Sequence, residues 1–135
     1  MALRCCLLAL VLLATSCQHK RIFSTSTIRQ LPVQQYAKQL ATDSNYYLID
    51  VRTPMEYSMS HIDSAINISY VFGRFQRRVE ALDTNRTVYL YCETAHRSPH
   101  ATKALKRAGF TRIYDLKHGY HTYRKHQRRL ARKQR

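Results

Sequence analysis

The segment YCETAHRSPHATKALKRAGF, residues 91–110, decides the fold class of this chain. Its first residue ends an apolar run, residues 88–91, and Cys92 follows at once. Ser98 and Pro99 open a helical pattern that stops at Gly109, in line with residue preferences at helix caps, first turns and helix ends. We therefore predict a buried strand, a short loop and a helix, with Cys92 where the strand ends.

The same alternation continues on both sides of this segment. Short apolar runs typical of strands lie at residues 46–51, 65–68 and 113–116. Patterns with helical spacing lie at residues 31–40 and 75–82 and from residue 120 onward. Thr53, Pro54 and Glu56 form a further helix start, with Thr as the cap and Pro at the first helical position. Strands that alternate with helices imply an α/β domain with a mostly parallel sheet, and 135 residues have room for one.

Residues 1–16 have the pattern of a secretory signal sequence. A single charge at Arg4 precedes an apolar run that is too short to span a bilayer. The sequence LATSC at residues 13–17 resembles a bacterial lipobox, which predicts a lipid on Cys17 after cleavage. An ordinary cleavage site is the alternative. We expect residues 17–26 to be a tether and the protein to be exported, on the periplasmic side, and lipid-anchored to a bacterial membrane.

The basic residues are concentrated at the end of the chain. The net charge is +15, and residues 117–135 contain eight Lys and Arg and no Asp or Glu. An exported chain rarely meets nucleic acid, so we expect anionic headgroups to be the partner of the basic tail, residues 126–135. The alternative is a solvated helix end with no partner.

Cys92 is the candidate for chemistry. Removal of the signal and lipidation of Cys17 leave it as the single free cysteine, so no internal disulfide framework is predicted. Open parallel sheets place ligand sites at the carboxyl ends of their strands. The following helix start and Arg97 favour a thiolate, His96 adds a titratable charge, and Glu93 opposes them. The alternative is a small buried residue at a strand end.

Four pieces of the chain, in order, resemble the rhodanese family of sulfurtransferases. They are LIDVRTPMEY (48–57), HIDSAINIS (61–69), YCETAHRSPHATKALKRAGF (91–110) and IYDLKHGYHTYRK (113–125). The resemblance implies a single domain over residues 27–125, with a five-stranded parallel sheet flanked by helices. It also implies that the first strand is a short piece near Thr27 and Ile28.

The resemblance further implies a reaction. In that family the cysteine accepts a sulfane sulfur from a donor such as thiosulfate, becomes a persulfide, and passes the sulfur to cyanide or a thiol. Cys92 is then the nucleophile, and Asp50, Arg52 and His61 match positions that support the loops. The implied substrate-binding residues are Glu93, Thr94, Ala95, His96, Arg97 and Ser98. We expect small sulfur-containing anions or thiols as partners, no cofactor or metal, and a monomer.

The chain departs from the family pattern in turns and in the closing helix. Ser60, Ser64 and His118 stand where the family has glycine, and Tyr123 stands where tryptophan is common. These departures concern loop shape more than the fold. Glu93 disfavours thiosulfate as the donor, because that molecule is a dianion.

Three other functions fit parts of the sequence. Cysteine-dependent phosphatases and arsenate reductases also pair a cysteine with an arginine, but with one more residue between them. The shorter gap from Cys92 to Arg97 suits a single sulfur better than a phosphate. A rhodanese-like domain can instead be a non-catalytic binding module anchored at the membrane. Cys92, His96 and His100 have a spacing compatible with a metal site, although structural zinc sites usually contain more cysteine.

Overall fold

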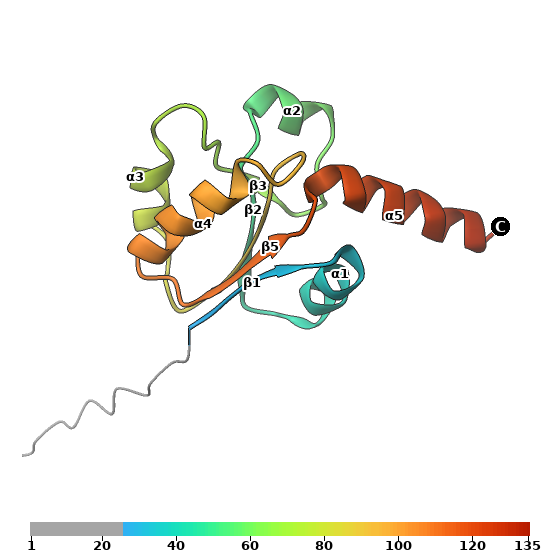
Figure 1. The fold of residues 1–135 in the computed structure, drawn as a ribbon, viewed down its shortest axis with the longest axis horizontal. Coiled ribbons are helices and arrows are strands. Elements are labelled where there is room, and N and C mark those ends of the chain that lie inside the picture. Colours follow the sequence, from blue (N-terminus) through green and yellow to red (C-terminus); the bar gives the residue numbers. More distant parts are fainter. Residues whose placement is uncertain (1–25) are drawn as a thin grey trace, which may run out of the picture.

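The computed structural model describes residues 26–135. The predicted signal sequence, the lipobox with Cys17 and nearly all of the tether lie outside the described residues. The centre of the fold is a five-stranded sheet in which every pair is parallel and the strand order is β1-β5-β4-β2-β3 (Figure 1). Its strands are β1 (Thr27–Leu31), β2 (Tyr46–Asp50), β3 (Ile66–Asn67), β4 (Thr87–Tyr91) and β5 (Arg112–Leu116). This confirms the predicted five-stranded parallel sheet.

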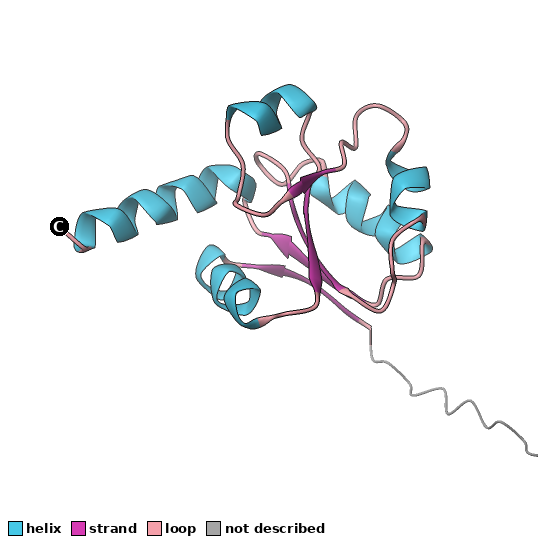
Figure 2. Ribbon diagram, turned by 180° about the vertical axis from the view of Figure 1, so that it is seen from behind, coloured by secondary structure: helices cyan, strands magenta, loops and turns pink. Residues whose placement is uncertain are grey.

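Helices cover both faces of the sheet, as Figure 2 shows from behind. They are α1 (Val33–Thr42), α2 (Pro54–Met59), α3 (Phe75–Glu80), α4 (Ser98–Arg107) and α5 (Gly119–Lys133). One buried cluster lies between the sheet and the pair α3 and α4, and another lies between the sheet and the pair α1 and α5. The short helix α2 follows β2 at the carboxyl edge of the sheet (Figure 1).

The central strand β4 sets the direction in which Cys92 points. All its residues are buried, and successive side chains point to opposite faces, as they must in a strand. Val88 and Leu90 therefore join the cluster under α3 and α4, whereas Tyr89 and Tyr91 join the cluster under α1 and α5. Cys92 continues the first series, so its side chain lies on the α3 and α4 side.

Several predicted boundaries differ from the structure. The first strand extends to Leu31 and pairs with β5 along its whole length, so the first helix begins at Val33 and not at residue 31. Pro32 separates the two elements because it lacks an N–H but suits a helix start. The strand predicted at residues 65–68 is the two-residue β3. Ser98 is the first helical residue of α4, and Arg97 takes the cap position predicted for Ser98.

Helix α5 crosses the predicted boundary at residue 126 without a break. Gly119 and Tyr120, at its start, are buried against the domain, whereas residues from 128 onward are exposed. Its second half extends away from the sheet (Figure 1). The predicted basic tail, residues 126–135, is therefore mostly helix. None of the helices within residues 26–135 is long and apolar enough to cross a membrane.

Candidate active site

The Cys92 thiol lies at the carboxyl edge of the sheet, directly after the central strand. Its side chain is buried, with 1% of the residue exposed. The thiol donates to Oγ of Ser98, and the two atoms are 3.7 Å apart. Ser98 is itself fully buried at the start of α4. Strand β4 thus presents the sulfur to the first turn of α4, as the strand and helix patterns in residues 91–110 predicted.

The backbone between Cys92 and α4 forms a ring of free donors, which we call the amide cradle: the N–H groups of residues 93–97. No acceptor within residues 26–135 takes a hydrogen bond from any of them. By contrast, the carbonyl of Arg97 is used, since it accepts from the N–H groups of His100 and Ala101 at 3.2 Å each. Unpaired N–H groups at the start of a helix favour an anion. The amide cradle can therefore hold a negatively charged atom beside the sulfur.

The start of α5 holds the other side of the loop in place. The N–H of Tyr120 donates to the carbonyl of Cys92 at 2.7 Å, and the N–H of His121 donates to the carbonyl of Glu93 at 3.2 Å. Gly119 makes this approach possible, because a Cβ there would lie 2.5 Å from the Cys92 carbonyl oxygen and 2.4 Å from that of Glu93. With both carbonyls turned toward α5, the amide cradle is left facing the opposite way.

Arg52 is buried at the centre of the supporting network. Its guanidinium donates to both carboxylate oxygens of Asp50, to Oε2 of Glu93 at 2.9 Å and to the carbonyl of Ser60. It also lies 4.2 Å from the ring centre of Tyr120. Burial lowers the pKa of Arg52, but hydrogen bonds to Asp50 and then to Glu93 outweigh this and raise it. Asp50 and Arg52 thus join three loops, and their role in supporting the site stays a prediction.

The carboxylate of Glu93 is paired on both oxygens. Oε2 accepts from Arg52, and Oε1 accepts from Nη2 of Arg124 on α5 at 2.6 Å. The sequence showed an acid beside Cys92 that opposes the thiolate. In the structure, two guanidinium groups compensate this charge. Their ion pairs with Glu93 hold the loop against α5 and the end of β2. Together with Asp50, which also pairs with Arg52, the cluster contains two carboxylates and two guanidinium groups, so their charges balance.

Arg97 is fixed by an acid from α2. Its guanidinium donates to both oxygens of Glu56, at 2.7 and 2.6 Å. Glu56 is also the second half of the predicted capping box, since its Oε2 accepts from the backbone and the hydroxyl of Thr53. The hydrogen bond from Arg97 lowers the pKa of Glu56 to about 2, although burial opposes this. The same bond raises the pKa of Arg97. The last residue of the loop is therefore tied to a helix outside it.

The remaining predicted residues divide into a loop tip and a distant support. Thr94 and His96 are exposed at the tip, with Oγ1 and Nδ1 at 3.3 Å from each other. Ala95, between them, has a left-handed backbone with φ of 63°. His61 lies elsewhere, with its ring stacked on Tyr57 at 4.0 Å and Nδ1 2.9 Å from the Tyr57 carbonyl. His61 thus contacts none of the loop residues, in keeping with its predicted packing role.

The departures from the family's glycines can now be placed on the backbone. Ser64 and His118 have φ values of 67° and 64°, so these non-glycine residues adopt left-handed conformations. Ser60 has φ of −173°, an extended conformation open to any residue. Tyr123 stacks on Tyr120 at 6.3 Å between ring centres. The loops therefore keep turns that glycine would adopt more easily, at a cost in backbone strain at two positions.

The structure argues against the metal site that the spacing of Cys92, His96 and His100 suggested. Residues 26–135 contain no group of three or more His, Cys, Asp or Glu that could hold a metal ion. His100 instead lies against the ring of Tyr70, with 6.1 Å between ring centres.

Sequence reasoning missed three residues that shape the site. Glu56 was recognised only as part of a helix cap, Arg124 only as one charge of the basic end, and Gly119 only as part of the closing motif. Each acts across a long separation in sequence. The capping box could have suggested that an acid lies near the carboxyl edge, but nothing local to it indicates Arg97 as its partner.

Comparison with known proteins agrees with this architecture. The family model described as "Rhodanese-like domain" matches residues 33–126. The chain is 41% identical over 73 residues to "Uncharacterized protein YqhL" of Bacillus subtilis, covering 54% of this chain and 56% of that protein. It is 25% identical over 93 residues to "Putative sulfur carrier protein YrkF" of the same organism, covering 69% of this chain and 49% of that protein. The chain thus spans about half the length of these curated relatives.

A further relative and two solved structures extend the comparison. "Probable adenylyltransferase/sulfurtransferase MoeZ" of Mycobacterium tuberculosis is 40% identical over 72 residues, which cover 53% of this chain and 18% of that protein. A rhodanese-related protein from Thermoplasma volcanium has a TM-score of 0.63 at 21% identity, covering 73% of this chain and 92% of that one. A rhodanese-like domain protein from Staphylococcus aureus has a TM-score of 0.62 at 20% identity, with 71% and 91% covered. At these identities the two structures show a shared fold.

Proposed function

The chain belongs to the family of rhodanese-like domains, and we propose that it is a sulfurtransferase in which Cys92 carries the transferred sulfur. The observation that carries this proposal is the position of the buried Cys92 sulfur, beside the Ser98 hydroxyl and at the start of a loop whose amide cradle has no acceptor within residues 26–135. Two similar proteins have sulfur carrier or sulfurtransferase in their names, which supports the same chemistry.

The proposed reaction consists of two displacements at sulfur. The Cys92 thiolate attacks the outer sulfur of a donor such as thiosulfate, so a bond forms between Sγ and that sulfur. The sulfur–sulfur bond of the donor breaks, and sulfite leaves with the electron pair. An acceptor thiolate or cyanide then attacks the outer sulfur of the persulfide, and Cys92 leaves as a thiolate. No net oxidant or reductant is required.

The terminal sulfur of a persulfide is an anion, and the amide cradle suits it. The N–H groups of residues 93–97 have no acceptor among the described residues, and the Ser98 hydroxyl lies beside Sγ. The pairing of Glu93 with Arg52 and Arg124 reduces its repulsion of an anionic donor. The sequence suggested that Glu93 disfavours thiosulfate as the donor. With Glu93 paired in this way, thiosulfate is a more suitable donor than the sequence suggested.

Mass spectrometry of the full chain tests the proposal. After exposure to thiosulfate and to several other sulfane donors, we expect a gain of one sulfur atom that peptide mapping places on Cys92. Peptide mapping is needed because Cys5, Cys6 and Cys17 are also present in the full chain. Cys92→Ala must lose both the adduct and sulfur transfer to cyanide, whereas Thr42→Ala, at the exposed end of α1, keeps them.

Either of two results would overturn the proposal. If the unmodified chain gains no sulfur on Cys92 with any donor, the domain is better described as a non-catalytic binding module. If Cys92→Ala still transfers sulfur, another group is the nucleophile.

For localisation, we propose export and a lipid on Cys17, on the strength of the sequence LATSC at residues 13–17. Metabolic labelling with a clickable fatty acid should mark the full chain and fail to mark Cys17→Ser. We expect that variant to leave the membrane fraction. A Cys17→Ser protein that stays bound would show that another part of the chain holds it there.

A further inference from the structure

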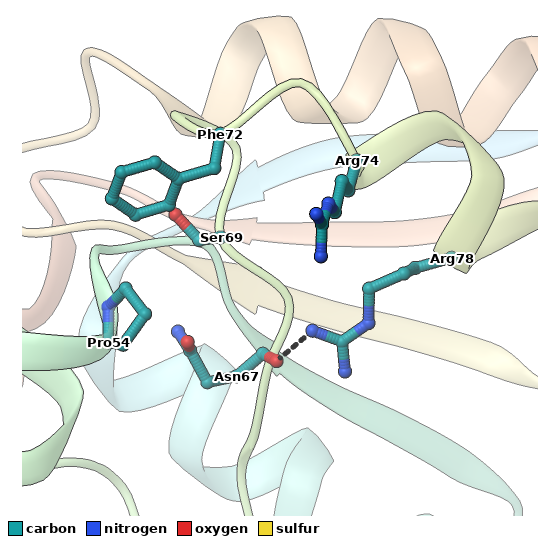
Figure 3. Close-up of a pocket in the computed structure, with 6 residues that line it drawn as sticks. All are labelled: Pro54, Asn67, Ser69, Phe72, Arg74 and Arg78. Atoms are coloured by element: carbon teal, nitrogen blue, oxygen red, sulfur yellow. Dashed lines mark hydrogen bonds between the residues drawn. The ribbon is translucent and has the colours of Figure 1, made fainter.

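A second polar pocket lies near the carboxyl edge, beside β3 and the start of α3. Its volume is about 650 Å³, within the usual range for small-molecule sites. Figure 3 shows its six lining residues, Pro54, Asn67, Ser69, Phe72, Arg74 and Arg78. Two of them carry guanidinium groups, and none carries a carboxylate. We call this site the Arg74/Arg78 pocket.

Most side-chain N–H donors of the two arginines in this pocket are not used by any of the described residues. The carbonyl of Arg74 accepts from the N–H of Arg78, but its side chain forms no hydrogen bond or ion pair with any residue in the described part of the chain. Arg78 uses only Nη1, which donates to the carbonyl of Asn67 at 2.9 Å. In Figure 3 both side chains extend from the same side, facing Phe72 and Pro54 across the space between them. The pocket thus combines a cationic side with an apolar side.

The sheet register relates this pocket to the Cys92 sulfur. Asp50 of β2 pairs with Asn67 on one side and with Tyr91 on the other. Because neighbouring strands are about 4.8 Å apart, Asn67 and Tyr91 are about 10 Å apart. Cys92 follows Tyr91, and its side chain packs in the same cluster as Phe75, the residue after Arg74. Helix α3, which carries Arg78, therefore covers the same face of the sheet as Cys92, and two strand spacings separate Asn67 from the strand that ends at Tyr91.

The apolar side of the pocket extends toward the active-site helix. Phe72 is exposed by 62% of its surface in the described part of the chain. Tyr70, in the same loop, lies against His100 in the first turn of α4. A ligand that follows this loop from the Arg74/Arg78 pocket reaches the start of α4, where the amide cradle lies.

We propose that the Arg74/Arg78 pocket binds a carboxylate or phosphate group of the acceptor thiol, whose sulfur end reaches the persulfide on Cys92. This inference rests on the proposed sulfurtransferase function. Guanidinium groups bind both kinds of anion with paired hydrogen bonds. Thiosulfate must contact the sulfur that follows Tyr91, and it is too short to extend from there to a pocket that begins at Asn67, two strands away, so the pocket suits the longer acceptor.

The step it serves is a balanced sulfur transfer. The acceptor thiolate attacks the outer sulfur of the Cys92 persulfide and forms a new sulfur–sulfur bond. The bond from that outer sulfur to Sγ breaks, and Cys92 takes the electron pair as a thiolate. The product is the persulfide of the acceptor, whose anionic end stays in the Arg74/Arg78 pocket until the product leaves.

Paired acceptor thiols test this inference. Cys92 is first loaded with sulfur, the donor is removed, and loss of the sulfur is followed by mass spectrometry after adding a thiol. Phosphopantetheine is compared with pantetheine, and mercaptopropionate with its methyl ester, because each pair differs by an anionic group. We expect the anionic member of at least one pair to react faster, and the pair that responds identifies phosphate or carboxylate as the group recognised.

Variants of α3 and its cap separate a specific site from a general charge effect. Arg74→Ala should slow discharge by the preferred anionic thiol about tenfold and leave the neutral partner unchanged, as expected for the loss of a charged hydrogen bond. The Arg74 side chain has no partner among residues 26–135, and alanine keeps the backbone carbonyl that accepts from Arg78, so this variant should fold normally. Arg77→Ala is the matched control, because it removes the same charge from the same segment but does not line the pocket. Equal effects of Arg74→Ala and Arg77→Ala would overturn the inference.

A binding measurement keeps the pocket testable without turnover. Inorganic phosphate is titrated into Cys92→Ser while the arginine side-chain N–H signals are followed by NMR. We expect saturable shifts of the Arg74 signal that Arg77→Ala retains. If the chain forms no persulfide, the proposed function fails while this titration still decides the pocket. If the persulfide forms but neither thiol pair discriminates and the Arg74 signal does not move, the pocket inference alone fails.

Discussion

Replacement of Glu56 by Gln should destabilise the domain in a pH-dependent way. Glu56 ties α2 to the last residue of the Cys92 loop through its paired hydrogen bonds with Arg97. The amide of Gln can still accept from Thr53 and keep the helix cap. The substitution therefore removes mainly the charge, and it leaves the Arg97 guanidinium without its anion.

The size of the effect follows from the pKa of Glu56. Its ordinary value of 4.5 falls to about 2 in the folded protein, which corresponds to about 3 kcal/mol at about 1.4 kcal/mol for each pKa unit. The side chains of Arg97 and Glu56 are 27% and 30% exposed, so water screens part of this attraction. We expect Glu56→Gln to lower the free energy of unfolding by about 1 to 2 kcal/mol near neutral pH.

The pH dependence has a definite sign. A lowered folded pKa stabilises the protein above the ordinary value of 4.5, and the contribution is lost as pH falls from 4.5 to about 2. Urea unfolding followed by circular dichroism should therefore show a gap between the unmodified chain and Glu56→Gln near neutral pH that closes near pH ~2. Glu80→Gln, at an exposed position of α3, is the control, and its free energy of unfolding should differ little from that of the unmodified chain. A gap of the same size at both pH values would refute the argument.

Four further substitutions have effects that the backbone and burial determine. Gly119→Ala should lower the free energy of unfolding by about 2 to 4 kcal/mol and impair sulfur loading, because its Cβ meets the loop carbonyls. Gly73→Ala, with φ of +67° and nothing within 4 Å, should cost only about 1 kcal/mol in the same urea titration. Ala95→Gly should raise the melting temperature, by relief of about 0.5 to 1 kcal/mol of left-handed strain, and an unchanged or lower value would contradict this. Burial raises the pKa of Asp115, so its stabilising contribution is present below its ordinary value of 3.8 and is lost as pH rises through the raised value. Asp115→Asn should therefore gain stability relative to the unmodified chain as the pH rises from acid to neutral. Parallel curves of stability against pH for the two proteins would argue against this.

Local patterns account for most of the fold that the sequence predicted. The apolar run of β4, the helix start at Ser98 and Pro99, and the stop at Gly109 depend on interactions within a few residues. The capping box from Thr53 to Glu56 is equally local, and the structure contains it. The first strand had no such signal, because its burial arises only when it pairs with β5.

The support of the loop could not be predicted in the same way. Glu93 meets Arg52 and Arg124, and Glu56 meets Arg97, across gaps of 31 to 41 residues. Any of several exposed arginines could have paired with these acids. Only the packing of α2 and α5 at the carboxyl edge selects the partners.

The sequence by itself determined the alternation of strands and helices, their mostly parallel arrangement and the position of Cys92 at the end of a strand. These follow from hydrophobic periodicity and helix caps, which act over short stretches of chain. The tertiary structure alone decided which way the loop faces, which arginines compensate Glu93, and that two arginines line a pocket near the sulfur. Those features depend on side chains distant in sequence being brought to the same edge of the sheet, where backbone contact at Gly119 and charge pairing select one arrangement.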